Sequence, residues 1–188
     1  MKTKKMLHQL NFKHIEREDY LLPSSLDKHN SSFIYGEVNP KHIVQIIKNL
    51  NHDCCNNFVD IGSGCGKLVI YVALEFPSKF CSGIEIHENR HQTAVALLED
   101  YISVYGTTEF QCADFMNVYF GNYDLLYCCN VIFSKEDNKK LYKKILTEFS
   151  GYAILFNYNY DLQHYLLNTI SVDTSWERKV NIYVFYIP

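Results

Sequence analysis

The sequence predicts an α/β fold in which a doubly wound sheet ends in an antiparallel edge hairpin. Between residues 40 and 156, short apolar runs alternate with segments of helical periodicity, which is the pattern of parallel strands joined by crossover helices. The first run leads into a glycine-rich loop and the second ends in an acid, as in a nucleotide-binding unit. Two strand-like segments close the chain, and they predict the antiparallel edge.

The N-terminal part is expected to be an arm followed by a helix. Residues 1–34 form the arm, in which residues 4–19 are compatible with a helix, and residues 35–188 are expected to form one folded domain. Asn39 and Pro40 have the residue types of a helix cap and of a first helical position. The helix that follows has one apolar face, made of Ile43, Ile46, Ile47 and Leu50.

The central elements alternate between strand and helix. Strands are predicted over residues 58–61, 80–85 and 108–111. A helix is predicted over residues 67–76, where Pro77 ends it, and a longer helix over residues 88–105. The buried face of the longer helix is expected to consist of Ala94, Val95, Leu98 and Ile102.

The C-terminal elements begin with a strand over residues 123–129 that ends at Asn130. Ser134 and Asp137 resemble a capping box, and Gly151 is expected just past the end of the helix that they open. The inward residues of this helix are Leu141, Ile145, Leu146 and Phe149. A strand over residues 152–156 and a hairpin of residues 174–176 and 180–187 complete the predicted fold.

Composition narrows the class of protein. A chain of 188 residues is expected to be one domain, and a net charge of −3 argues against strong binding to nucleic acid. Neither a signal peptide nor a membrane-spanning run is recognisable, so we expect no membrane partner. The seven cysteines include no C-x-x-C pair, which is typical of a reducing compartment, and we expect the protein in the cytoplasm or nucleus.

The loop after the first predicted strand indicates a ligand site. Gly62, Gly64 and Gly66 alternate along it, directly before a helix begins, so the backbone can approach a ligand closely. Asp60 precedes the loop, and Glu85 ends the next strand, where an acid can hold a ribose diol. A tight turn without a ligand would explain the glycines but not the second acid.

The identity of the ligand follows from what the loop lacks. A dinucleotide-binding loop would have a third glycine at position 67, and a phosphate-binding loop would have a glycine at position 61 and Ser or Thr at position 68. The order D-x-G-x-G-x-G with a later acid is instead similar to the S-adenosylmethionine loop of class I methyltransferases. Asp60 suits the ammonium group of that cofactor, and the loop amides suit its carboxylate.

Two other motifs have simpler explanations. His87 to His91 match the H-E-x-x-H signature of zinc proteases, but the match lies at the start of a helix and no clear third ligand follows, so we expect no metal site. The basic cluster Lys139, Lys140, Lys143 and Lys144 is expected to be a solvated helix face.

Several short motifs occur in an order that resembles one methyltransferase family. They are Ile34-Tyr35-Gly36-Glu37, the glycine loop, Asp114-Phe115, Asn130-Val131-Ile132-Phe133, and Ser175-Trp176 with Tyr183. Together they look like the catalytic core of the disruptor-of-telomeric-silencing family, the non-SET lysine methyltransferases that act on histone H3. The resemblance covers roughly residues 20–188 and implies the seven-stranded, Rossmann-like class I methyltransferase fold over residues 35–188.

The resemblance also implies roles for individual residues. Closure over the cofactor would fall to Tyr35, Gly36 and Glu37. The methionine and ribose parts would be held by Asp60, Gly62, Gly64, Gly66, Glu85 and Ile86. Adenine would be held by Asp114 and Phe115. Asn130 would lie at the reacting end of the cofactor, and Trp176 and Tyr183 would line the lysine channel. The chain departs from the family at Lys67, usually glutamine, at Val38, usually threonine, and at residues 154–157, which lack a serine-rich end.

The predicted function is therefore S-adenosylmethionine-dependent methylation of a protein lysine, with histone H3 as the leading substrate. Such a site needs no strong catalytic base, because an apolar aromatic channel disfavours the charged amine. Asn130 would orient the reactants, and its location at a strand tip suggests that replacing it would spare folding. Two alternatives remain open: a methyltransferase for a small molecule or another nucleophile, and a non-catalytic subunit that binds the cofactor. An N-P-P-Y-like run of DNA amino-methylating enzymes is absent after residue 130.

Overall fold

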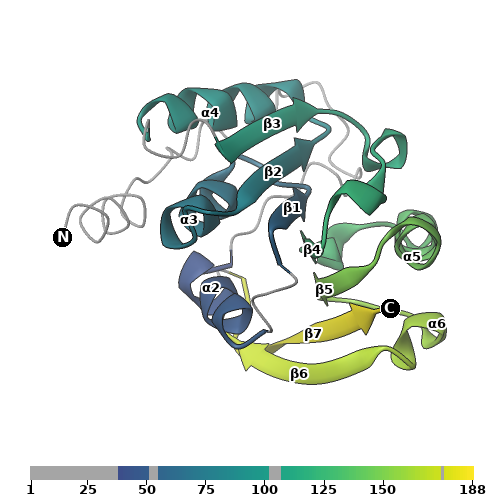
Figure 1. Ribbon diagram of the computed structural model, residues 1–188. Coiled ribbons are helices and arrows are strands. Elements are labelled where there is room, and N and C mark those ends of the chain that lie inside the picture. The colour runs from purple at the N-terminus through teal and green to yellow at the C-terminus, as the bar shows by residue number, and fades with distance from the viewer. Residues whose placement is uncertain (1–37, 51–54, 102–106, 175) are drawn as a thin grey trace.

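A computed structural model describes residues 38–50, 55–101, 107–174 and 176–188. Its centre is a seven-stranded sheet with the strand order β3-β2-β1-β4-β5-β7-β6 (Figure 1). Five strands are parallel: β1 (Asn57–Ile61), β2 (Phe80–Glu85), β3 (Thr108–Cys112), β4 (Leu125–Cys128) and β5 (Gly151–Leu155). The last two, β6 (Leu166–Val172) and β7 (Val180–Ile187), form the antiparallel edge. The predicted fold class is confirmed.

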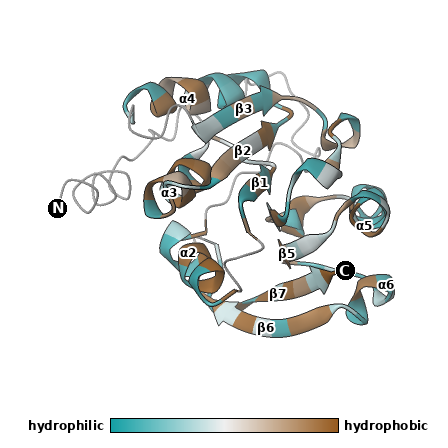
Figure 2. Ribbon diagram, viewed as in Figure 1, coloured by the Kyte–Doolittle hydropathy of each residue, from teal (hydrophilic) through white to brown (hydrophobic). Residues whose placement is uncertain are grey.

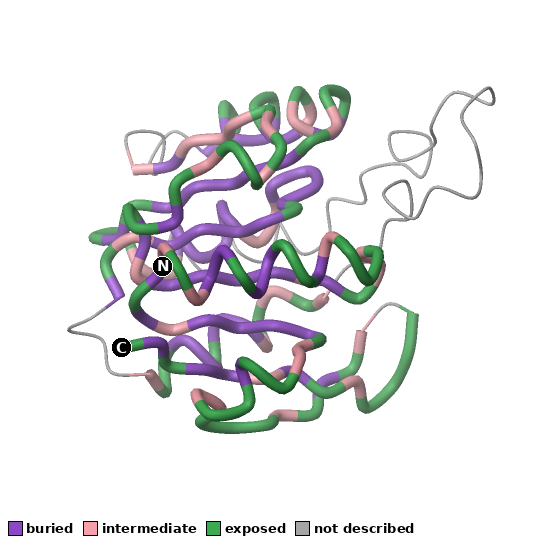
Figure 3. The backbone as a smooth tube through the Cα atoms, turned by 90° about the vertical axis from the view of Figure 1, so that its right-hand side faces the viewer, coloured by how far each residue is buried: buried purple, intermediate pink, exposed green. Residues whose placement is uncertain are grey.

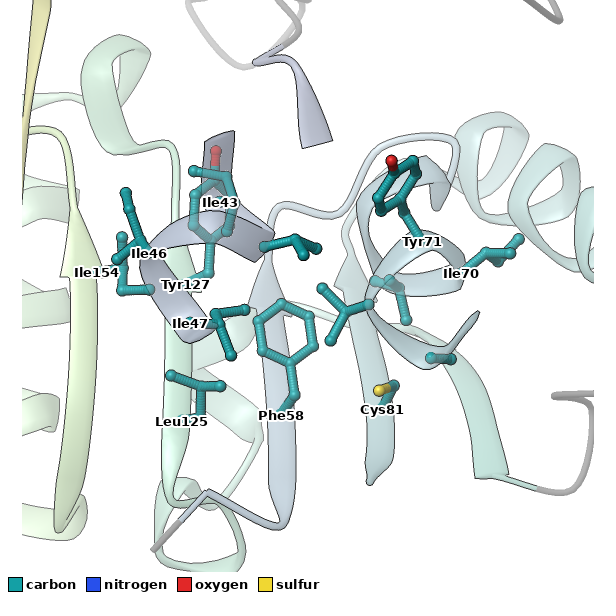
Figure 4. Packing of buried hydrophobic residues seen from close by; sticks show 14 of the residues in the cluster. Ile43, Ile46, Ile47, Phe58, Ile70, Tyr71, Cys81, Leu125, Tyr127 and Ile154 are labelled. Atoms are coloured by element: carbon teal, nitrogen blue, oxygen red, sulfur yellow. The ribbon is translucent and has the colours of Figure 1, made fainter. Parts of the chain in front are cut away.

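One face of the sheet is covered by α2 (Pro40–Lys48), α3 (Lys67–Glu75) and α4 (Glu88–Glu99). Asn39 caps α2 as predicted, because its side chain accepts a hydrogen bond from the Lys41 amide at 3.1 Å. Figure 4 shows how Ile43 and Ile47 of α2 pack with Phe58 of β1 and Leu125 of β4. This packing anchors the strand that leads into the glycine loop.

The opposite face is covered by α5 (Lys135–Glu148) and the short α6 (Tyr160–Gln163), with 3-10 turns over Phe115–Asn117, Phe120–Asn122 and Asn130–Ile132. The predicted cap at Ser134 is confirmed, since its hydroxyl accepts from the Asp137 amide at 3.0 Å. The Asp137 carboxylate accepts from that hydroxyl at 2.6 Å. Leu141, Ile145 and Phe149 are buried as expected. Both faces of the sheet are therefore covered, and its central strands are largely buried, as the purple segments of Figure 3 show. In Figure 2 these strands carry both apolar and polar residues, since β1 includes the polar Asn57 and Asp60.

Several predicted details are wrong. The long helix after β2 ends at Glu99, and Val95 is exposed, although Ala94 and Leu98 are buried. Gly151, by contrast, lies past the end of α5 as expected and is the first residue of β5. A Cβ there would lie 2.2 Å from the Asp124 carbonyl oxygen, so the position requires glycine. Lys144 belongs to the buried part of α5, where its ammonium group lies 2.7 Å from Glu148.

The closing hairpin also differs from the prediction. Its first strand is β6 (Leu166–Val172), a segment for which no strand was predicted, whereas Thr174 forms a single antiparallel bridge with Val38. The central residues of β6 are exposed, so the strand lacks the apolar alternation by which strands are recognised in sequences. Residues 102–106, the predicted helix over 4–19, and Tyr35, Gly36 and Glu37 lie outside the described residues.

Candidate functional site

The glycine loop joins the carboxyl end of β1 to the first turn of α3. Gly62, Gly64 and Gly66 have φ angles of 78°, 55° and 77°, a region that side-chain-bearing residues rarely adopt. Gly66 is confined further, because a Cβ there would lie 2.5 Å from the ring of Phe110 and 2.8 Å from Ala94. The loop conformation thus depends on all three glycines, and on a ring of β3 that packs beneath it.

Backbone amides of the loop are largely engaged with protein partners. The amides of Gly62 and Ser63 donate to the Ile84 carbonyl at 2.8 and 3.0 Å, and that of Gly66 donates to the Ser63 carbonyl at 2.9 Å. The Gly64 amide donates to Glu85 Oε2 at 2.8 Å. The loop amides were expected to suit the carboxylate of a cofactor, but in this structure those of Gly62, Ser63 and Gly64 bind β2 and that of Gly66 closes a turn within the loop.

Two carboxyl groups lie at neighbouring strand ends beside the loop, since β1 pairs with β2 through Asp60 and Gly83. Glu85 is buried, and its second oxygen, Oε1, accepts from the His87 amide at 2.9 Å. Asp60 is buried too, and its carboxyl makes no hydrogen bond or ion pair with another of the described residues. Burial, and secondarily the nearby Glu85 carboxyl, raise the pKa of Asp60 well above its usual range.

This pair of acids fits a ligand that carries a cation and hydroxyl groups. An ammonium group beside Asp60 would replace the solvation that the carboxylate loses on burial. Each oxygen of Glu85 accepts one amide and retains a lone pair for a hydroxyl donor. The donor set therefore suits the methionine ammonium group and the ribose diol of an adenosine cofactor.

Aromatic rings lie close to the same end of the sheet. Phe115 and Phe133 stack with centroids 5.8 Å apart and an interplanar angle of 17°. Phe133 is also the side chain nearest to a Cβ built on Gly62, at 4.0 Å. Asp114 is exposed and its Oδ1 accepts from the Met116 amide at 2.9 Å, so it caps the turn that carries Phe115. Ile86, directly after Glu85, is 57% exposed and available to a ligand.

Asn130 lies in a saturated network. Its Oδ1 accepts from the amides of Phe156 and Asn157, both at 3.0 Å. Its Nδ2, with two N–H groups, lies within hydrogen-bond distance of three acceptors: Asn138 Oδ1 at 2.6 Å, the Tyr142 hydroxyl at 3.1 Å and the Asn157 carbonyl at 3.0 Å. The expectation that this residue lies outside the core is wrong, because its exposure is 0%. Its side chain joins the end of β4, α5 and the segment after β5.

The two expected channel residues contact different rings. Tyr183 is half-buried opposite Leu155, the last residue of β5, and its ring meets that of Tyr158 at 4.7 Å. Trp176 is 39% exposed, and its ring centroid lies 6.2 Å from that of Phe156. No ring contact between Trp176 and Tyr183 occurs in the described part of the chain. Sequence reasoning did not identify Tyr158, for which only the proximity to the end of β5 was available as a signal.

Metal ligands do not gather in the residues that the structure describes. No group of three or more His, Cys, Asp or Glu side chains there could hold an ion, and this includes the His87–His91 segment.

A helix that crosses a membrane must be both long and apolar. None of the helices in the described residues has both the length and the apolar character that such a crossing requires.

The model of one protein family, the histone methylation protein DOT1, matches residues 23–179. The chain belongs to this family. The motif resemblance is thereby confirmed, and the matched span contains every strand from β1 to β6 and the glycine loop with both of its acids.

Curated relatives of this DOT1-family chain are named histone-lysine N-methyltransferase, H3 lysine-79 specific. The protein of Caenorhabditis elegans is 34% identical over an alignment of 105 residues that covers 50% of this chain and 11% of the relative. That of Kluyveromyces lactis is 34% identical over 70 residues, or 37% of this chain and 12% of the relative. The matched part thus corresponds to about a tenth of these proteins.

Solved structures with the same fold are methyltransferases of other kinds. An RNA methyltransferase from Salinibacter ruber, in complex with S-adenosyl-L-homocysteine, has a TM-score of 0.63 at 18% identity and covers 81% of this chain and 94% of its own. Magnesium protoporphyrin IX methyltransferase from Synechocystis has a TM-score of 0.63 at 13% identity and covers 97% of both chains. At such identities the likeness establishes the class I fold of the DOT1-family chain.

Proposed function

We propose that this chain is an S-adenosylmethionine-dependent protein-lysine N-methyltransferase with a lysine of histone H3 as its leading substrate. The observation that carries the proposal is the pair of buried carboxyls, Asp60 and Glu85, beside a three-glycine loop in a chain of the DOT1 family. The family relatives are named for histone H3 lysine, and two neighbours of the same fold hold this cofactor or its demethylated product. An action on histones would locate the protein in the nucleus.

Binding of the cofactor is assigned to the glycine-loop end of the site. Asp60 receives the ammonium group, and Glu85 receives the ribose hydroxyls through the lone pairs that the loop amides leave free. Phe115, stacked on Phe133, offers an apolar surface to the adenine ring. Tyr35, Gly36 and Glu37 are assigned to closure over the cofactor through the family motif.

Methyl transfer is assigned to the carboxyl ends of β4 and β5 and to the part of β7 that pairs with the end of β5. When bound, S-adenosylmethionine supplies a methyl group on a positively charged sulfur, and a neutral lysine amine takes it as the carbon–sulfur bond breaks. The chain contributes alignment and exclusion of water, with Tyr183 as part of the wall and Trp176 at its outer side. Asn130 contributes by holding the segment after β5 in position. No base of the enzyme is required, because the aromatic wall disfavours the charged amine.

The proposal is tested by methyl transfer. The protein is incubated with cofactor labelled on its methyl group and with nucleosomes, free histones or a lysate, and modified residues are identified by mass spectrometry. We expect label on lysine, a rate that rises with pH because the free amine has a pKa of about 10.4, and full activity in the presence of a chelator. The variant Glu85→Ala is the matched control, with slower transfer expected at a cofactor concentration near the parental Kd. Label on oxygen, on a nucleobase or on a small molecule, and none on lysine, contradicts the proposal.

A further inference from the structure

The segment after β5 is held by three hydrogen bonds from a single side chain. Asn130 accepts the amides of Phe156 and Asn157 and donates to the Asn157 carbonyl, each at 3.0 Å. Asn130 is itself held by Asn138 and Tyr142 of α5. The backbone at positions 156 and 157 is therefore fixed relative to β4 and α5, and the next residue begins from a defined position.

That next residue is Tyr158, whose amide donates to Asn157 Oδ1 at 2.9 Å. Tyr158 is half-buried, and its ring centroid lies 4.7 Å from that of Tyr183 and 5.3 Å from that of Phe185. The interplanar angles are 62° and 63°. Because Tyr183 pairs with Leu155, the last residue of β5, the rings of Tyr158 and Tyr183 form an edge-to-face pair at the carboxyl end of the sheet. This is the edge from which the glycine loop and the buried acids also project.

The pair has the properties of a binding wall for an alkyl amine. Edge-to-face rings are rigid, and they present apolar surface against which the methylene stem of a lysine can pack. The partner of Tyr183 in this wall is Tyr158, while Trp176 contacts Phe156 of the segment that Asn130 holds. The wall is thus built from one residue that the family resemblance assigns and one that it does not.

We propose that Tyr158 is an acceptor-binding residue that forms, with Tyr183, the wall for the lysine stem, and that Asn130 positions it. The inference rests on the proposed function and extends it by naming a further residue for the acceptor. Tyr158 contributes contact area and shape to the acceptor side and takes no part in holding the cofactor, whose expected ligands Asp60 and Glu85 lie on β1 and β2.

The test compares Tyr158→Ala with Tyr158→Phe, which keeps the ring, and with Tyr160→Ala as a matched control. Tyr160 lies two residues away, is 73% exposed, and its ring contacts His164. For each variant, the KM for nucleosomes or histone H3, kcat, the Kd of S-adenosylmethionine and the melting temperature are measured. We expect Tyr158→Ala to raise the acceptor KM about tenfold with an unchanged cofactor Kd. Tyr158→Phe should recover most of the loss, and Tyr160→Ala should behave as the parent.

Three outcomes decide the matter. A parent that methylates lysine, together with a parental acceptor KM in Tyr158→Ala, overturns this inference alone. An equal loss of cofactor affinity, or a loss that follows the melting temperature and is not recovered by Tyr158→Phe, assigns Tyr158 to the framework of the domain and overturns it as well. A parent that transfers no methyl group to lysine overturns the proposed function, and this inference with it.

Discussion

Asp60 and Asn130 are two buried polar residues at the same end of the sheet, on or just after neighbouring strands, yet their surroundings are opposite. Asn130 makes hydrogen bonds with both ends of its amide, to two residues of α5 and to the segment after β5. Asp60 has a buried carboxyl, no recorded partner among the described residues, and a second carboxyl nearby. A saturated polar group stabilises the fold, whereas an unsatisfied one destabilises it until a ligand binds.

The comparison changes the interpretation of Asn130. A motif residue at a strand tip was expected to act on the reactants, but its polar atoms are already engaged with protein partners. We therefore propose that its effect on catalysis is indirect, through the position of Phe156, Asn157 and the ring of Tyr158. Asp60 and Glu85, by contrast, have capacity left for a ligand.

The largest expected effect is on stability. Asn130→Ala removes a buried amide and leaves the amides of Phe156 and Asn157 without their acceptor. We expect a loss of about 3–4 kcal/mol in the free energy of unfolding, or roughly 6–16 °C in melting temperature. Chemical denaturation and thermal unfolding of parent and variant measure it. A variant as stable as the parent would show that the network does not support the fold.

The next effect is on cofactor binding. Glu85→Ala removes the carboxylate that we propose receives the ribose hydroxyls, and also the acceptor of the Gly64 and His87 amides. The affinity for S-adenosylmethionine should fall at least tenfold, which is about 1.4 kcal/mol, as measured by isothermal titration. Asp124→Asn serves as a control, because Asp124 likewise accepts hydrogen bonds from two backbone amides, those of Asn56 and Asn57. Asp124 directly precedes β4, so it lies at the amino ends of the parallel strands, away from the site. Unchanged affinity in Glu85→Ala contradicts the ribose assignment.

In the protein without ligand, Asp60→Asn should raise stability, whereas Asn130→Ala should lower it. A carboxyl with a raised pKa binds its proton more tightly in the folded state than in the unfolded state. The folded protein therefore loses stability as the pH rises above 3.8, the ordinary pKa of the group. The amide introduced by Asp60→Asn does not titrate, so the variant avoids this loss. At neutral pH the variant should melt about 2–4 °C higher, or ~1 kcal/mol, and the difference should vanish toward acid pH. A variant that melts lower at neutral pH would indicate a structural partner for Asp60.

The smallest effect is expected for Tyr142→Phe. The hydroxyl group accepts from Asn130 and donates to Asn138 Oδ1 at 2.9 Å, but Asn130 retains its other partners when the hydroxyl is removed. A loss of about 0.5–1.5 kcal/mol in unfolding free energy follows, with no change in cofactor affinity. Combining Tyr142→Phe with Asn130→Ala in a double-mutant cycle should give a total below the sum of the two single effects.

The features that the sequence predicted well have local causes. The caps at Asn39 and Ser134 bond to amides two and three residues away, and the glycine loop needs positive φ at positions that the sequence shows directly. What the sequence did not reveal is tertiary. The saturation of Asn130 depends on partners up to 27 residues away, and the Tyr158–Tyr183 pair depends on the register of β5 with β7. β6 was missed because its exposed middle leaves no alternating pattern.

We propose that the buried carboxyl of Asp60 receives the ammonium group of S-adenosylmethionine. Isothermal titration of the parent and of Asp60→Asn with that cofactor tests this claim most directly. The parent should bind with micromolar Kd, and the variant at least tenfold more weakly, although it unfolds at an equal or higher temperature. Binding of equal strength in both proteins, or no binding by a folded parent, would contradict the account.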